Sequence, residues 1–186
     1  MEEEIRKTIK VLKAGGIILY PTDTVWGIGC DATIREAVEK IRKLKRRKKN
    51  NGFIVLADNR EMLLRYVIEI PASLRDLIDI RTPLTVIYPH SKGLAGNVVA
   101  EDGSIGIRIT RDEFCRKLVC AFKKPIVSTS ANISGSPVPC YYKQINEHIL
   151  NGVDYIVNLR RNEKDFSKPS EVIKLAVNGE IEIVRK

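Results

Sequence analysis

Strand-length apolar runs alternate with helical segments along almost the whole chain, and this alternation limits the fold more than any other feature. Such runs occur at residues 17–20, 53–57, 84–88, 105–109, 125–131, 155–159, 171–177 and 180–185. Asn178-Gly179 separates the last two runs, which is the strongest short-range pattern for a β-hairpin. Mixed strand and helix order ending in a hairpin predicts an α/β fold. We expect a single domain over residues 1–186, with a twisted mixed parallel and antiparallel sheet of about seven strands flanked by helices.

Helical spacing of apolar residues predicts the segments between the strands. A first helix is expected over about 3–14, stopped by Gly15-Gly16. Thr33 and Glu36 have the spacing of a capping box, so a second helix is expected from there to about residue 44. Further helices are predicted from Ser73, from about Asp112, and over 144–150. The polar, aperiodic stretch 160–170 is predicted to be a mobile loop.

The charge balance indicates an anionic partner. Lys and Arg number 32 against 23 Asp and Glu, which gives a formal net charge of +9. Nucleotide phosphates, nucleic acid or an acidic membrane surface would all suit that surplus. No apolar run is long enough to span a bilayer, and the opening Met-Glu-Glu-Glu does not resemble a signal peptide. We therefore expect a cytoplasmic protein without a membrane association.

Several common catalytic patterns are absent or weak. The sequence has no P-loop motif, no Cys-x-x-Cys pair among its four cysteines, and only two histidines, so no metal-binding residues are predicted. His90 and His148 are interpreted as surface residues rather than bases. Gly27-x-Gly29-x-x-Ala32 matches a dinucleotide fingerprint only superficially, because the position of the ribose-binding acid falls in a lysine run.

Three polar clusters remain as candidates for a ligand site. Residues 22–27 (TDTVWG) follow a buried strand and form either a ligand pocket or a polar turn. Residues 42–49 hold seven cations in eight positions, either as a solvated helix end or as a binding surface for phosphate or RNA. Residues 128–135 (STSANISG) offer small donors that suit a phosphate or carboxylate, although they also fit an ordinary hydrophilic loop. Arg108 is a lone cation in an apolar strand, facing water or clamping a carboxylate.

These clusters together resemble the YrdC-like family of threonylcarbamoyl-AMP synthases, over essentially the whole chain. PTDTVWGIGCDA (21–32) resembles the signature P-T-[DE]-T-[VY]-[YW]-G-L-G, and Lys45-Arg46-Arg47 falls at the K-x-R element. STSANISG is similar to S-x-S-A-N-x-S-G. TPLTVIYP (82–89), SIGIRIT (104–110), PSEVIKL (169–175) and IEIVR (181–185) resemble further family segments. The resemblance implies a YrdC-like fold with a concave basic face.

The implied activity is the synthesis of threonylcarbamoyl-AMP and pyrophosphate from L-threonine, bicarbonate or CO2, and ATP. A tRNA-modifying transferase complex would then use the product. Mg²⁺ is implied as an ion held mainly by phosphates and water. Attack of a carbamate oxygen on the α-phosphorus needs positioning and charge neutralisation, with no protein nucleophile.

Position by position, the resemblance also implies residue roles. The residues implied for threonine are Thr22, Thr24, Trp26 and Arg108. Those implied for the phosphates of ATP are Lys45, Arg47, Ser130, Asn132 and Ser134, with Thr129, Ser170 and Arg185 as further nucleotide contacts. The cations left to face RNA are Arg42, Lys43, Arg46, Lys48 and Lys49. We expect the three clusters to meet around one cavity.

The sequence departs from the family pattern at three places and leaves two alternatives open. Lys48 stands where the family has Pro, Asn51 where it has a second Lys, and Trp26 where Tyr is commoner. One alternative is a non-catalytic protein of the same fold that binds double-stranded RNA or tRNA through its +9 charge. The other is a paralogue with a different substrate.

Overall fold

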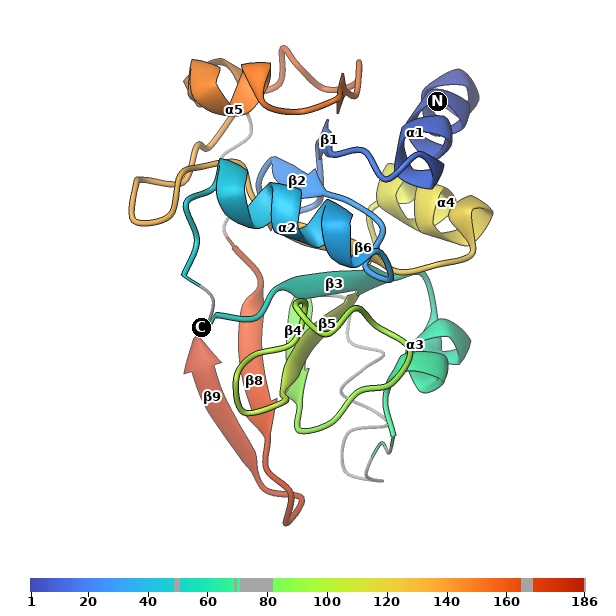
Figure 1. Cartoon of the computed structure of the whole chain (residues 1–186), viewed down its shortest axis with the longest axis vertical. Coiled ribbons are helices and arrows are strands. Elements are labelled where there is room, and N and C mark those ends of the chain that lie inside the picture. The colour runs from blue at the N-terminus through green and yellow to red at the C-terminus, as the bar shows by residue number, and fades with distance from the viewer. Residues whose placement is uncertain (49–50, 69, 71–81, 165–168, 186) are drawn as a thin grey trace.

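A computed structural model describes residues 1–48, 51–68, 70, 82–164 and 169–185. Nine strands in these residues form one sheet, in the order β7-β1-β2-β6-β3-β5-β4-β8-β9 (Figure 1). They are β1 (Ile18–Tyr20), β2 (Gly27–Gly29), β3 (Ile54–Ala57), β4 (Leu84–Tyr88), β5 (Ile105–Ile109), β6 (Ile126–Ser130), β7 (Tyr155–Ile156), β8 (Glu171–Leu175) and β9 (Ile181–Arg185). The pairs β1/β7, β3/β5 and β4/β8 are parallel and the other five are antiparallel, so the predicted mixed sheet is confirmed.

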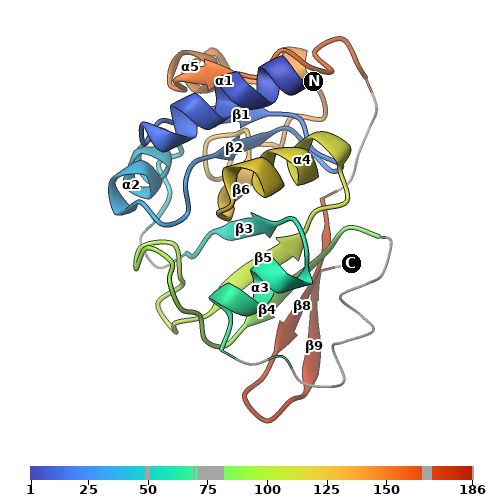
Figure 2. The same cartoon turned by 90° about the vertical axis from the view of Figure 1, so that its right-hand side faces the viewer.

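Five α-helices pack around this sheet. They are α1 (Glu2–Lys13), α2 (Arg35–Leu44), α3 (Arg60–Tyr66), α4 (Glu113–Phe122) and α5 (Glu147–Asn151), all within the described residues. Helices α1 and α4 pack together and lie in front of β1, β2 and β6 in Figure 2, while α3 contacts β3 and β5. No helix in the described ranges is long and apolar enough to cross a membrane.

Strand β2 was not predicted, because its glycines break the apolar pattern. Gly29 is required here for close packing: a Cβ at this position would lie 2.6 Å from the carbonyl oxygen of Val127 and 2.8 Å from the ring of Tyr20. Only a residue without a side chain allows β2 to pack so closely against Tyr20 of β1 and beside β6. Gly29 of the superficial dinucleotide pattern therefore serves strand packing.

Two predicted helix starts are wrong. The Thr33 hydroxyl does not cap α2; it donates to Asp31 Oδ1 at 2.6 Å, and Ile34 at the N-cap has no side-chain hydrogen bond. Asp31 is buried and its carboxylate also pairs with Lys124 at 2.8 Å. The Thr33 hydroxyl is hydrogen-bonded to this fixed carboxylate and is therefore not directed at the N-terminus of α2. The helix expected over 144–150 divides into a 3-10 turn and α5, because the Asn146 side chain accepts from the backbone N–H of His148 and begins a new helix.

Two other segments complete the comparison with the sequence. Helix α3 was missed, although Asn59 caps it by accepting from the backbone N–H of Met62. The helix predicted from Ser73 lies outside the described residues, as do residues 165–168 of the predicted mobile loop.

Candidate functional site

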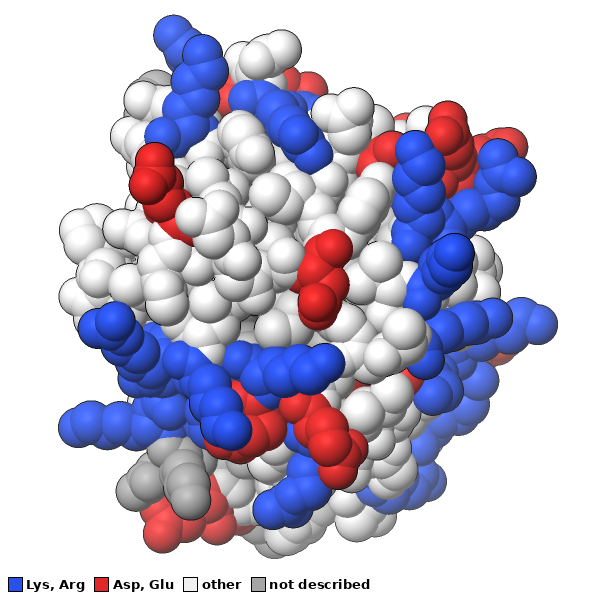
Figure 3. Space-filling model, turned by 45° about the horizontal axis from the view of Figure 1, so that its top comes forward, with Lys and Arg blue, Asp and Glu red and all other residues white. Residues whose placement is uncertain are grey.

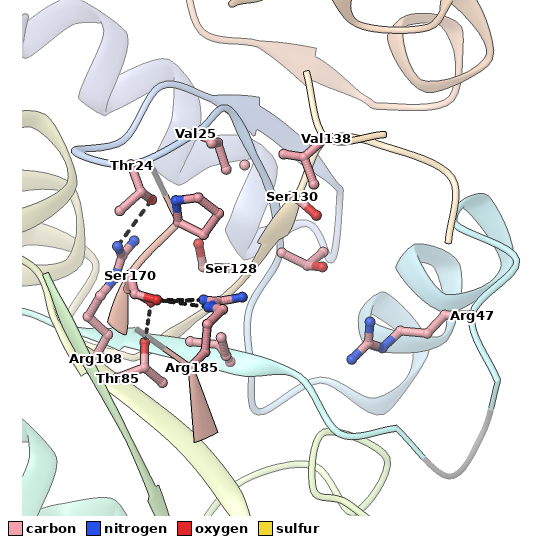
Figure 4. A pocket seen from close by; sticks show the side chains of 14 residues that line it. Thr24, Val25, Arg47, Thr85, Arg108, Ser128, Ser130, Val138, Ser170 and Arg185 are labelled. Atoms are coloured by element: carbon pink, nitrogen blue, oxygen red, sulfur yellow. Dashed lines mark hydrogen bonds between the residues drawn. The ribbon is translucent and has the colours of Figure 1, made fainter. Parts of the chain in front are cut away.

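A cavity of about 240 Å³ lies where the turn before β2, strands β5 and β6, and the C-terminal strands meet (Figure 4). Among the described residues, its walls combine small hydroxyl and apolar side chains with three arginines and no carboxylate. The lining residues are Thr24, Val25, Gly27, Arg47, Ile54, Thr85, Arg108, Ser128, Thr129, Ser130, Val138, Pro169, Ser170 and Arg185. Three guanidinium groups facing one hollow make this a site for an anion.

Arg108 occupies one end of the cavity. It is 4% exposed on β5, and its Nη1 donates to the Thr24 hydroxyl at 3.1 Å and lies 3.2 Å from Asp23 Oδ1. Its buried Nε has no hydrogen-bond partner within the described part of the chain. A buried arginine with an unpaired N–H donor can bind the carboxylate of a ligand. While the cavity is empty, Asp23 balances the charge of Arg108.

The Thr22 side chain shapes the turn rather than lining the cavity. Its hydroxyl lies 2.9 Å from the Thr24 hydroxyl, donates to the carbonyl oxygen of Val25 and accepts from the Thr24 backbone N–H. Trp26 is buried against the Tyr142 ring, with centroids 5.0 Å apart. Both residues line a second, smaller hollow of about 130 Å³, which shares Thr24 and Val25 with the main cavity.

The loop after β6 is held by Lys45. The Lys45 side chain is 1% exposed, and its ammonium donates to the carbonyl oxygens of Ser130 and Asn132 and to the Asn132 side chain. The Ser130 hydroxyl donates to Asn132 Oδ1 at 2.6 Å. Burial, with a smaller effect from the nearby charge of Arg47, lowers the pKa of Lys45 to about 7. Lys45 and Asn132 therefore support the cavity wall from behind, and Ser134 is exposed on the same loop.

Arg47 reaches the cavity because Phe53 holds it. The guanidinium groups of Arg42 and Arg47 both stack on the Phe53 ring, at 4.8 and 4.9 Å from its centroid. Arg47 also donates to the carbonyl oxygen of Gly52 at 2.6 Å. Burial, and secondarily Arg42, lowers the pKa of Arg47.

The prediction that Arg42 faces RNA is wrong. It is 4% exposed and donates to the carbonyl oxygens of Lys48, Asn51 and Asn97, so it fixes the connection from α2 to β3. Lys43, Arg46 and Lys48 are exposed, and Lys49 lies outside the described residues.

The structure brings the predicted clusters together. The predicted site residues that line the cavity are Thr24, Arg47, Arg108, Thr129, Ser130, Ser170 and Arg185. Pairing of β2 with β6 sets Gly27 opposite Ser130, which unites the first and third clusters. Thr85 was missed, and Ser128 belonged to the third cluster without being given a ligand role. Both are polar residues inside apolar strands, the signal that identified Arg108, but a strand hydroxyl is too common to be selected by that signal.

The mixed sheet and its arginine-lined cavity define the chain as an anion-binding α/β protein. Comparison with known proteins then identifies its family. The family model Sua5_yciO_yrdC, described as "Telomere recombination", matches residues 10–186. A threonylcarbamoyl-AMP synthase of Vibrio campbellii is 34% identical over 174 residues, covering 91% of this chain and 93% of its own. The chain belongs to the Sua5/YciO/YrdC family.

Solved structures agree with this assignment. P. abyssi Sua5 complexed with L-threonine has a TM-score of 0.82 at 28% identity, covering 94% of this chain. The present chain spans about half of that protein, 52% of its length. E. coli YciO shares the fold, with a TM-score of 0.84 at 22% identity over 100% of this chain and 90% of its own.

Proposed function

We propose that this protein is a threonylcarbamoyl-AMP synthase, which makes threonylcarbamoyl-AMP and pyrophosphate from L-threonine, bicarbonate or CO2, and ATP. One observation carries the proposal: Thr24, Ser130 and three arginines from distant segments line the same cavity. The name of the V. campbellii relative and the threonine complex of P. abyssi Sua5 support it.

The arginines and the hydroxyl residues of the cavity would bind different groups of the substrates. Arg108 would bind the threonine carboxylate, with Thr24 beside it, while Thr22 and Trp26 keep the turn in shape. Arg47 and Arg185 would neutralise the phosphates of ATP, and the hydroxyls of Thr129, Ser130 and Ser170 would donate to phosphate oxygens. In this arrangement the carbamate oxygen forms a bond to the α-phosphorus as the bond to pyrophosphate breaks. Positioning and charge neutralisation suffice for this step.

Mg²⁺ is proposed to enter with the nucleotide. No group of three or more carboxylate, histidine or cysteine side chains in the described residues could hold a metal ion. The ion would therefore be held by phosphates and water, with the protein supplying the surrounding cations. We also propose a cytoplasmic, single-domain enzyme whose product passes to a tRNA-modifying transferase complex.

The test is threonine-dependent and bicarbonate-dependent release of pyrophosphate from ATP. Purified protein should release pyrophosphate only when all three substrates are present. R108A should lower kcat/KM for threonine by about 100-fold, because charge-assisted hydrogen bonds to a carboxylate contribute about 1.5–3 kcal/mol. R116A, which removes an exposed arginine of α4, is the matched control and should behave as wild type. Failure of the wild-type protein to release pyrophosphate with all substrates present contradicts the proposal.

Binding to double-stranded RNA or tRNA is proposed as an accompanying property. Figure 3 shows lysine and arginine side chains gathered at its lower left and along its right-hand side, around a surface with little charge. Together with the net charge of +9, exposed Lys43 in the last turn of α2 and exposed Arg46 and Lys48 just after it favour contact with a phosphate backbone.

A further inference from the structure

We propose that Thr85 is a positioning residue, which holds Ser170 and, through it, Arg185 at the nucleotide end of the cavity. The inference rests on the proposed function, which assigns that end of the cavity to ATP. Thr85 lies in the segment TPLTVIYP, which resembles a family segment, but the resemblance gave this threonine no role.

A short chain of hydrogen bonds carries the proposal (Figure 4). Thr85 is completely buried on β4, and its hydroxyl lies 2.8 Å from the Ser170 hydroxyl at the start of β8. Arg185 of β9 donates from Nε and Nη2 to the carbonyl oxygen of Ser170, at 3.0 and 2.7 Å, and from Nη2 to its hydroxyl at 3.4 Å. Ser170 thus joins β4 to the only charged group that the terminal hairpin places in the cavity wall, as far as the described residues extend.

Packing fixes the direction of the Thr85 hydroxyl. The Thr85 methyl group faces Gly106 of β5, where an added Cβ would lie 3.4 Å from that methyl and 3.1 Å from Ile54 Cγ1. A β-branched side chain has few accessible rotamers, and here its methyl group rests beside Gly106. Because the methyl group lies beside Gly106, the Thr85 hydroxyl points toward Ser170.

The consequence for ATP concerns the remaining donors of Arg185. Nε and Nη2 are occupied by Ser170, whereas Nη1 makes no hydrogen bond to any described residue. Its two N–H groups are therefore available to a phosphate, in an orientation that Ser170 sets. Loss of the Thr85 hydroxyl frees the Ser170 side chain to rotate away from Nη2. The backbone carbonyl oxygen of Ser170 then holds Arg185 alone, and the donor pair on Nη1 is less firmly oriented.

Two substitutions separate the hydroxyl from the packing. T85V keeps the branched shape and removes the hydroxyl, while T85S keeps the hydroxyl and removes the methyl group. We expect T85V to raise KM for ATP about five- to ten-fold, the range for loss of one hydrogen bond that orients a charged group. KM for threonine should stay within about two-fold, and T85S should restore KM for ATP close to wild type. Calorimetric titration with a nonhydrolysable ATP analogue should show the same weakening without turnover.

A double-mutant cycle tests whether Thr85 acts through Ser170. In an S170A background, T85V should weaken binding of the ATP analogue no further, because the intermediate hydroxyl is already absent. T85A provides a second hydroxyl-free variant if T85V folds poorly by urea unfolding. Equal ATP affinity of T85V, T85A and wild type overturns the inference, as does a T85V effect that is unchanged in S170A. These results would leave the proposed function intact, because that function is tested by pyrophosphate release from the wild-type protein. If wild type does not bind the analogue at all, the inference is overturned directly.

Discussion

At the scale of single residues, Lys45 is a buried cation whose hydrogen bonds stabilise the fold without any ligand. Its ammonium is buried against carbonyl oxygens of the β6 loop. Replacing it with methionine keeps the length of the side chain and removes the donor that the carbonyl oxygens of Ser130 and Asn132 share, although the Asn132 backbone N–H still donates to Ser130. K45M should lower the free energy of unfolding by about 1–3 kcal/mol, the cost of unsatisfied buried acceptors. It should also weaken ATP binding, because the loop carries Ser130. Urea unfolding and calorimetric titration check the two effects.

The pH dependence of stability gives a second readout of Lys45. Its pKa falls from 10.5 to about 7 on folding, so between these values the unfolded chain holds a proton that the folded chain has released. The free energy of unfolding of wild type relative to K45M should therefore rise as pH increases from about 7 toward 10. Urea titrations at several pH values measure this difference. A flat difference would mean that the three acceptor oxygens keep the Lys45 pKa near its ordinary value.

Asp23 and Arg108 form a buried pair at the other end of the cavity. Their side chains are 18% and 5% exposed, and Arg108 Nη1 lies 3.2 Å from Asp23 Oδ1. D23N removes the negative charge and leaves a buried guanidinium uncompensated, which should cost about 3 kcal/mol of stability. E36Q, at an exposed acid of α2, should change stability by less than about 0.5 kcal/mol. If D23N is as stable as E36Q, then Arg108 does not need Asp23 in the empty site.

At the scale of elements, the connection from α2 to β3 combines the hydrogen bonds of Arg42 with one aromatic ring. Phe53 is 2% exposed and contacts the guanidinium groups of both Arg42 and Arg47. F53L keeps an apolar side chain and removes the π-faces, so Arg47 loses part of what directs it into the cavity. We expect KM for ATP to rise about three- to ten-fold, with about 1 kcal/mol lost in stability. F114L, in the core of α4, should cost similar stability without changing KM for ATP.

The same connection shows what the sequence could and could not reveal. The run 42–49 identified a cationic element, but its pattern did not separate Arg42 and Lys45, which are buried, from Lys43 and Arg46, which are exposed. Helical phase accounts for Leu44 pointing inward. It also places Arg42 and Lys45 on the face of Val38 and Ile41, but a cation at such a position is ordinarily expected to reach water. What buries these two is their partners, which are carbonyl oxygens of loops whose positions depend on the tertiary fold. Burial of a charge follows from long-range partners, and no local pattern contains them.

At the scale of the whole molecule, the order of the strands in the sheet could not be predicted from the sequence. Alternating apolar runs predicted a mixed sheet with a terminal hairpin, and both are present. Nothing in those runs sets Thr85 of β4 opposite Val172 of β8, or places β7 beside β1. Family motifs supplied most of the cavity in advance because they mark the ends of strands. Thr85 carries no charge that would mark it within its strand as Arg108 is marked, and its contact with Ser170 depended on the pairing of β4 with β8.

Charge is also a property of the whole molecule, and it supplies the last prediction. If exposed cations after α2 contact an RNA duplex, the logarithm of its affinity should fall steeply and linearly with the logarithm of salt concentration. The triple variant K43E/R46E/K48E should weaken binding at least about ten-fold and make the slope shallower by about one unit for each phosphate that the variant no longer binds. R6E/K10E/R116E changes the net charge equally at exposed positions on α1 and α4, and should have a smaller effect. Filter-binding titrations from about 50 to 200 mM salt distinguish the cases. Equal weakening by both variants would assign the binding to net charge alone, and an affinity that is independent of salt would contradict phosphate binding altogether.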